Sequence, residues 1–241
     1  MALMSSPRAV IRAVLLSQVL LGAAIVWIDL ADGAGVAAPG LFSPEDGPGI
    51  RPYRPDQQPA SAPGAPAMGP MPKALEFEVV GDEITMTGQI ATGDADRFAA
   101  WMQENQPQAR RVLLNSSGGS VADSLAIGRT IRASGMDTHV GPGAVCLSAC
   151  PYLLAAGARR STAPGASVGV HQHYFGKNTV LPAFMAVSDM QRAQASVMDY
   201  LDEMGVDLRL MTHSLRTQPE DINILSPALM RDLRLTTEDA G

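Results

Sequence analysis

Short apolar segments and glycine-rich turns alternate with helical segments through the middle of the chain. Arg111 to Asn115 is an apolar segment that ends in Ser-Ser-Gly-Gly, and Val121 to Ser134 then repeats apolar residues at helical spacing. Two further short segments, Thr138 to Val140 and Ser167 to Val170, flank a second glycine turn and a helical segment from Ser148 to Ala156. Such alternation is typical of layered domains with a largely parallel sheet. The sequence therefore predicts an α/β fold.

The flanking segments extend this domain. Leu75 to Val80 and Glu83 to Ile90 alternate apolar and polar residues around a Gly-Asp turn, which predicts paired strands. A helix is predicted from Asp94 to Glu104, because apolar residues recur at helical spacing and a proline follows. Three more elements are predicted towards the C-terminus: a long helical stretch at 182–216 interrupted at Gly205, an extended piece at 221–225 and a last helix at 227–233.

The N-terminal residues have the order of an export signal. Arg8 and Arg12 precede an apolar run at 13–28. Its sixteen residues lie between the core of a signal peptide and the roughly twenty residues of a spanning helix. Cleavage after Ala38 and retention as a membrane anchor both fit this length. The sequence predicts export, with residues 1–38 as signal peptide or anchor.

A proline-rich linker is predicted after this segment. Residues 39–72 contain ten prolines and five glycines and almost no periodic apolar pattern. Such a composition buries too little apolar surface to offset the entropy of ordering. The folded domain is therefore expected at 73–241.

Charge and cysteine content limit the partners. The net charge is −6, and no basic run is longer than Arg110-Arg111 or Arg159-Arg160, so nucleic acid is not expected. Cys146 and Cys150 supply too few ligands for a metal site, and no cofactor is predicted. In an exported chain these cysteines either form a local disulfide or remain buried thiols. A bridge at this spacing is sterically demanding on a regular helix.

Ser148 has the setting of a nucleophile. It follows the glycine turn at 141–143 and opens a predicted helix, where backbone N–H groups surround its hydroxyl. The N–H of Ala149 is the natural first donor to an oxyanion. Gly118 and Gly119 end the preceding strand at the same sheet edge and allow a second N–H to approach a substrate. A serine that only caps the helix is the alternative interpretation.

His171 follows a predicted strand at the same edge and is the candidate general base. His173 competes for this role, because it shares a face with His171 in an extended chain. Ordinary loop histidines remain the plainer interpretation of both. His139 and His213 have no comparable setting and are interpreted as structural.

Four ordered segments resemble the proteolytic subunit of Clp protease: EITMTGQ at 83–89, VLLNSSGGSV at 112–121, SACPYLLAAG at 148–157 and APGASVGVHQ at 163–172. The resemblance extends over residues 83–235. It implies a ClpP/crotonase-like layered fold of repeated β-β-α units with a long C-terminal handle helix. It also implies Ser148 as nucleophile, His171 as its histidine, and Gly118, Gly119 and Ala149 as the oxyanion hole. With the export signal and the paired cysteines, the sequence is similar to a predicted periplasmic branch of this family.

The third catalytic residue is where the chain departs from the family. The family's acid follows the handle helix, and this chain is several residues shorter there, with Pro-Glu-Asp-Ile-Asn at 219–223. Asp221 is predicted for this role and Asn223 is the second choice, because an amide orients a histidine but stabilises the imidazolium less. Ser117 also stands where the family usually has proline.

These features together predict a serine peptidase that attacks peptide or protein substrates through an acyl-enzyme on Ser148. It is expected at the periplasmic side of the inner membrane, anchored by its N-terminal segment or released to the periplasm. A non-catalytic relative that binds peptides or partners in the same cleft is the alternative. Crotonase-type acyl-thioester chemistry uses the same fold without a serine nucleophile, but coenzyme A esters are scarce outside the cell. The resemblance further implies a homo-oligomer formed through the handle helix. No ATPase partner is expected, because the exported compartment lacks ATP.

Overall fold

The computed structural model describes residues 7–31, 70–172 and 183–237. It divides the chain into two compact units, Met1–Asp46 and Gly47–Gly241. Up to residue 69, the predicted proline-rich linker lies outside the described residues. Its last residues belong to the folded unit, since the Pro72 carbonyl accepts the Gln89 N–H at 2.9 Å and Met71 packs against buried side chains.

Helix α1 (Pro7–Ala31) contains the apolar run at 13–28. The side chains described in it, at residues 9–24 and at Trp27, are exposed. Among the helices that the structure describes, none combines the length and apolarity needed to cross a membrane.

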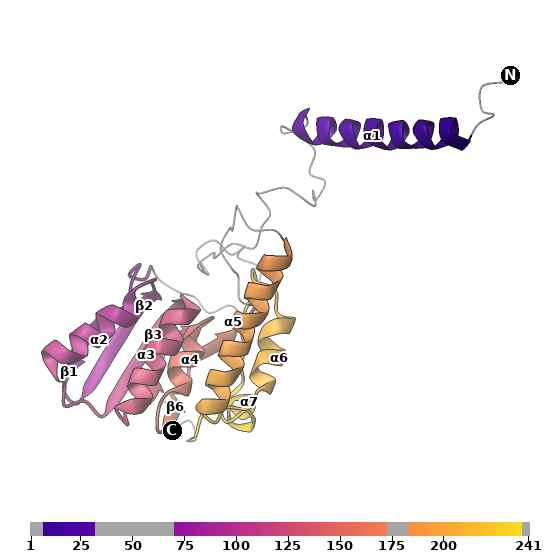
Figure 1. The fold of residues 1–241 in the computed structure, drawn as a ribbon. Coiled ribbons are helices and arrows are strands. Elements are labelled where there is room, and N and C mark those ends of the chain that lie inside the picture. The colour runs from indigo at the N-terminus through magenta and orange to yellow at the C-terminus, as the bar shows by residue number, and fades with distance from the viewer. Residues whose placement is uncertain (1–6, 32–69, 173–182, 238–241) are drawn as a thin grey trace. The chain divides into compact units, whose positions relative to one another are not determined.

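Within the described residues, a mixed eight-stranded sheet forms the centre of the second unit (Figure 1). Its strands are β1 (Glu76–Val80), β2 (Glu83–Ile90), β3 (Arg111–Gly119), β4 (Asp137–Val140), β5 (Val145–Leu147), β6 (Arg160–Thr162), β7 (Ser167–Val170) and β8 (Asn223–Ile224). The order is β1-β2-β3-β5-β7-β8, with β4 beside β3 and β6. The outer pairs β1–β2 and β7–β8 are antiparallel and the pairs between them are parallel. The predicted α/β fold with a largely parallel sheet is confirmed.

On the side away from β2, strand β3 pairs with two strands in succession, β4 and then β5, and this fork creates the edge that carries the site. Its first residues, Arg111 to Leu113, pair with β4, whereas Ser116 pairs with Cys146 of β5. The Asn115 side chain accepts the Val145 N–H at 3.2 Å and so fixes the start of β5. The carboxyl ends of β3, β5 and β7 consequently meet at one edge, where open α/β sheets bind ligands.

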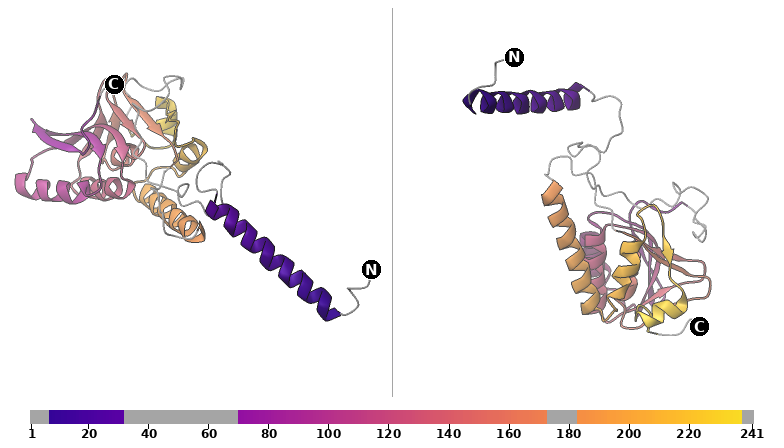
Figure 2. Two further views of the ribbon diagram at one scale, coloured as in Figure 1. Left: turned by 90° about the horizontal axis from the view of Figure 1, so that it is seen from above. Right: turned by 90° about the vertical axis from the view of Figure 1, so that its right-hand side faces the viewer.

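Six helices of the described chain accompany the sheet (Figures 1 and 2): α2 (Asp94–Asn105), α3 (Val121–Ala133), α4 (Cys150–Ala155), α5 (Ala183–Glu203), α6 (Arg209–Arg216) and α7 (Pro227–Asp232). Gly135 caps α3 with a φ of 68°. The long C-terminal helical stretch is interrupted at Gly205, which has a φ of 69°. The glycines are suited to these positions because a left-handed φ carries no steric penalty without a Cβ.

Two short strands were not predicted, and one helix begins later than expected. Strands β5 and β6 have three residues each, which is too short to show a period of two. Helix α4 begins at Cys150 rather than at Ser148, because Ser148 has a left-handed backbone.

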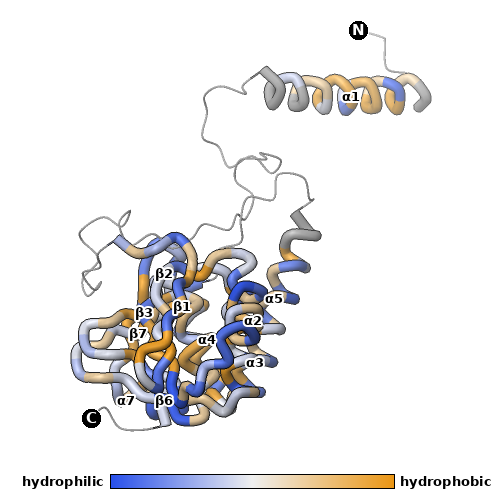
Figure 3. The backbone as a smooth tube through the Cα atoms, turned by 90° about the vertical axis from the view of Figure 1, so that its left-hand side faces the viewer, coloured by the Kyte–Doolittle hydropathy of each residue, from blue (hydrophilic) through white to orange (hydrophobic). Residues whose placement is uncertain are grey.

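The hydrophobic core lies between the sheet and the helices. Figure 3 shows hydrophobic stretches along the strands and α4, while α2 is mostly hydrophilic. Helices α3 and α5 cross closely, since a Cβ at Gly128 would lie 2.0 Å from the Tyr200 hydroxyl. That hydroxyl donates to the Tyr152 carbonyl at 2.7 Å, so a buried polar group is satisfied where three helices meet.

Arg160 places a buried charge among the helix ends. Its side chain is 5% exposed, and it donates to the carbonyls of Ala155, Met204 and Arg234 at 3.0, 2.7 and 2.8 Å. These carbonyls lie just beyond or at the C-terminal ends of α4, α5 and α7, where helix dipoles favour a cation. Burial, followed by the neighbouring Arg132, lowers the pKa of Arg160 to about 10, so it remains charged at neutral pH.

We expect Arg160→Met to lower the free energy of unfolding by about 3 kcal/mol or more, because buried carbonyls lose their donor. Urea unfolding followed by circular dichroism measures this loss. The control is Arg159→Met at the adjacent position, where the side chain is 69% exposed and pairs with Asp137. That change should cost about 1 kcal/mol or less, and equal losses in both variants would contradict the role given to Arg160.

Candidate active site

Ser148 lies in a strained turn between β5 and α4. Its φ is 60°, a left-handed conformation that costs a residue with a Cβ roughly 1–2 kcal/mol. The Ser148 N–H donates to the Gly169 carbonyl at 2.9 Å, so the pairing of β5 with β7 continues one residue beyond the strand. A strained, well-held residue at the carboxyl end of a parallel strand is typical of a functional position.

The parallel register brings His171 to Ser148. Leu147 pairs with Gly169, so the residues that follow these two strands meet at the same edge. His171 is 5% exposed, and its Nε2 lies 2.7 Å from Ser148 Oγ. The expected contact between Ser148 and His171 is present. His173, the competing histidine, lies outside the described residues.

The second ring nitrogen of His171 defines the tautomer. Nδ1 lies 2.9 Å from the carbonyl oxygen of Pro219. A carbonyl only accepts hydrogen bonds, so the ring proton resides on Nδ1. Nε2 is then the unprotonated nitrogen and accepts the hydroxyl proton of Ser148. This is the arrangement that a general base requires.

The prediction of Asp221 as the partner of this histidine is not met by the structure. Asp221 is exposed and makes no hydrogen bond to His171 within the described part of the chain. Its N–H donates to the Gln218 carbonyl at 3.0 Å, and this turn presents the Pro219 carbonyl to the ring instead. Asn223, the second choice, pairs through β8 with Val170. No sequence pattern indicates a backbone carbonyl in this role, because every residue has one.

Burial lowers the pKa of His171 below its ordinary value of 6.5. The hydrogen bond to Pro219 and the negative charge of Glu220 act in the opposite direction and favour the imidazolium. Glu220, rather than Asp221, is thus the acidic residue with an electrostatic effect on the ring. The net effect keeps His171 neutral at pH 7, ready to accept a proton.

The Gly118 backbone lies against the nucleophile turn. A Cβ at this position would lie 2.5 Å from the Leu147 carbonyl oxygen and 2.6 Å from Ser148 Cβ. Its own N–H donates to Ser116 Oγ at 3.1 Å and is therefore occupied. Ala149 is buried, and its N–H donates to no other described residue. The structure thus brings Gly118 and Ala149 to Ser148, with the Ala149 N–H as the open donor.

Gly119 packs against Ile90 of β2 rather than against the nucleophile turn. A Cβ there would lie 2.1 Å from the Ile90 carbonyl oxygen, which also accepts the Ser120 N–H at 2.8 Å. Because consecutive peptide groups of a strand point to opposite sides, the Gly119 N–H faces away from β2. The Asp123 carboxylate fixes the following loop, since it accepts the Gly93 N–H and the Ser120 hydroxyl.

A disulfide encloses the nucleophile turn. Cys146 and Cys150 are bonded to each other, with their Cα atoms 5.0 Å apart. Only Cys150 belongs to a helix, while Cys146 lies in β5, so the geometry of a regular helix does not oppose the bridge. Of the two arrangements that the sequence left open, the structure has the disulfide. Within the described residues, no group of His, Cys, Asp or Glu is arranged to hold a metal ion.

One buried polar group at this sheet edge lacks a hydrogen bond within the described residues. Ser117 Oγ is buried and has no hydrogen-bond partner among the described residues. Ser117 is the position where the resemblance led us to expect a proline, which carries no hydroxyl. A buried hydroxyl without a hydrogen bond lowers the free energy of unfolding by roughly 1–3 kcal/mol. Packing therefore does not explain why serine stands here in place of proline.

Comparison with known proteins identifies the family. A model of the Clp protease family matches residues 80–240. No curated protein matches the chain. The matched region contains the strands and turns that carry Ser148, His171 and Gly118. Since the match covers more than half of the chain, and the mixed α/β fold agrees with it, this protein belongs to the Clp protease family.

Proposed function

We propose that this protein is an exported serine hydrolase, a peptidase that acts through an acyl-enzyme on Ser148. One observation carries the proposal: the 2.7 Å contact between Ser148 Oγ and the unprotonated Nε2 of His171. Membership of the Clp protease family supports peptide bonds as the substrate class.

In this mechanism, His171 Nε2 takes the Ser148 proton as Oγ attacks the carbonyl carbon of the substrate. The resulting oxyanion accepts hydrogen bonds from the N–H groups of Ala149 and Gly119. The imidazolium then gives its proton to the leaving amine, and an acyl-enzyme remains on Oγ. Water, deprotonated by the same histidine, hydrolyses this ester and restores Ser148.

The Pro219 carbonyl orients the imidazole throughout, as a carboxylate does in other serine hydrolases. A neutral carbonyl stabilises the imidazolium less than a carboxylate does. The charge of Glu220 compensates for part of this difference. The partner seen at Nδ1 is a neutral carbonyl, and this observation favours a second candidate function, a non-catalytic protein that binds peptides at this edge.

Two observations support export. The basic residues, apolar run and small residues of the N-terminal segment follow the order of a signal peptide. The folded unit contains the Cys146–Cys150 disulfide, and disulfides persist in oxidising compartments such as the periplasm.

The first test is labelling of the purified full chain with a fluorophosphonate probe. We expect covalent labelling of the wild type, none of Ser148→Ala, and a rate lowered by roughly 10²-fold or more in His171→Ala, which lacks the general base. His213→Ala, a half-buried histidine of α6, is the matched control and should label at the wild-type rate. A folded wild-type protein that does not label would indicate the peptide-binding function instead.

The pH dependence of labelling tests the environment of His171. Only the neutral imidazole accepts the serine proton, so the rate should rise with pH and reach half its maximum below pH 6.5. Glu220→Gln removes a charge that favours the imidazolium and should move this midpoint to lower pH. Glu203→Gln on α5 is the control and should leave it unchanged. A wild-type midpoint above 6.5 would contradict the assignment.

The close approach of Gly118 supplies a further test. Gly118→Ala places a methyl group against the Leu147 carbonyl and Ser148, so labelling should fall by at least about 10²-fold, as when an oxyanion donor is lost. Gly135→Ala is matched, because Gly135 also has a left-handed φ but a Cβ there meets nothing within 4 Å. Equal labelling rates of these two variants would show that the approach of β3 is not required.

A further inference from the structure

We propose that the Cys146–Cys150 disulfide is a positioning device for the nucleophile. It holds the turn that presents Ser148 Oγ to His171 and the Ala149 N–H to the substrate. This inference rests on the proposed hydrolase function, because it assigns a role within the same site.

The ring closed by the disulfide contains only the residues of the turn. Cys146 is the middle residue of β5 and Cys150 is the first residue of α4. Leu147, Ser148 and Ala149 lie between them, and Ser148 has the left-handed φ of 60°. The nucleophile and the open donor are thus inside the ring, whereas the general base is outside it.

The backbone hydrogen bonds at the turn leave one N–H without an acceptor among the described residues. On the strand side, the Ser148 N–H is held by the Gly169 carbonyl at 2.9 Å. On the helix side, the Ala149 carbonyl accepts the Tyr152 N–H at 3.2 Å. The peptide group between Ser148 and Ala149 donates to no described residue, as an oxyanion donor must before substrate arrives. The disulfide spans this peptide group and limits its rotation without occupying its N–H.

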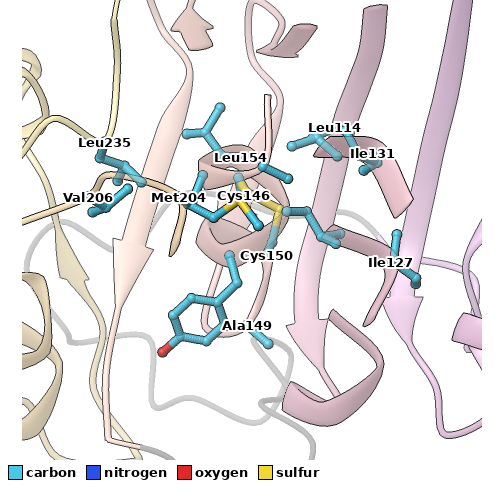
Figure 4. Packing of buried hydrophobic residues seen from close by; sticks show 14 of the residues in the cluster. Leu114, Ile127, Ile131, Cys146, Ala149, Cys150, Leu154, Met204, Val206 and Leu235 are labelled. Atoms are coloured by element: carbon cyan, nitrogen blue, oxygen red, sulfur yellow. A yellow bond between two sulfur atoms is a disulfide. The ribbon is translucent and has the colours of Figure 1, made fainter. Parts of the chain in front are cut away.

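The surroundings of the sulfur atoms indicate that the bridge is not needed to fill the core. Both cysteines are 0% exposed and lie in the hydrophobic core near Leu154 and Met204 (Figure 4). A buried free cysteine behaves as a small hydrophobic residue, so the core stays packed when the bridge is absent. A ring this short also restricts the unfolded chain less than a long one. The main effect of the bridge therefore falls on the turn.

The experiment compares the full-length wild type with a double variant, Cys146→Ala together with Cys150→Ala. We expect the double variant to fold and its fluorophosphonate labelling rate to fall at least tenfold. The pH at half-maximal labelling should stay at the wild-type value, because His171 lies outside the ring. Val197→Ala, a truncation of a fully buried residue on α5, is the matched core variant and should keep the wild-type rate.

Several outcomes would overturn the inference. A double variant that labels within twofold of the wild type shows that the turn keeps its geometry without the bridge. Failure of the double variant to fold shows that the bridge serves the fold itself. An equal loss of rate in Val197→Ala indicates general loosening of the core. If the wild type itself does not label, the proposed hydrolase function fails first, and with it the role of the bridge.

Discussion

The parallel pairing of β5 with β7 is the interaction on which the candidate site depends. It aligns Leu147 with Gly169 and continues through the Ser148 N–H, which holds a strained residue in place. The same alignment delivers His171 to Ser148 Oγ. Strand β3 then adds Gly118 from the other side, where only a glycine leaves room for the turn. Three strand ends at one sheet edge thus bring Ser148, His171 and Gly118 together.

The orientation of His171 shows how backbone groups can replace side chains in such a site. The Pro219 carbonyl defines the tautomer, because this requires only an acceptor at Nδ1. Stabilisation of the imidazolium is a different requirement, and a neutral dipole meets it less well. Here burial disfavours the charged ring, while Glu220 favours it. The balance between the two determines how strong a base the histidine is.

The helices also help to hold the candidate site in place. Helix α4, which follows the nucleophile, is held at its start by the disulfide and at its end by Arg160. Arg160 joins the ends of three helices through backbone carbonyls alone, so its charge is balanced by helix dipoles. Displacement of α4 would move Ala149 and Ser148 directly, since only Ala149 lies between Ser148 and Cys150, the first helical residue. Stability of the helical layer and geometry of the site are therefore coupled through α4.

The sequence by itself determined the α/β class, the hairpin, most helices, and Ser148, His171 and Gly118 as residues of one edge. Each of these follows from periodicity, from glycine positions or from family resemblance, all of which are properties of side chains along the chain. Strands β5 and β6 escaped prediction because three residues show no period. Asp221, the residue predicted to orient His171, is exposed in a turn, and the Pro219 carbonyl lies at the ring instead. Only the tertiary structure decided between disulfide and thiols and chose the histidine's partner, because both depend on where the backbone lies in space.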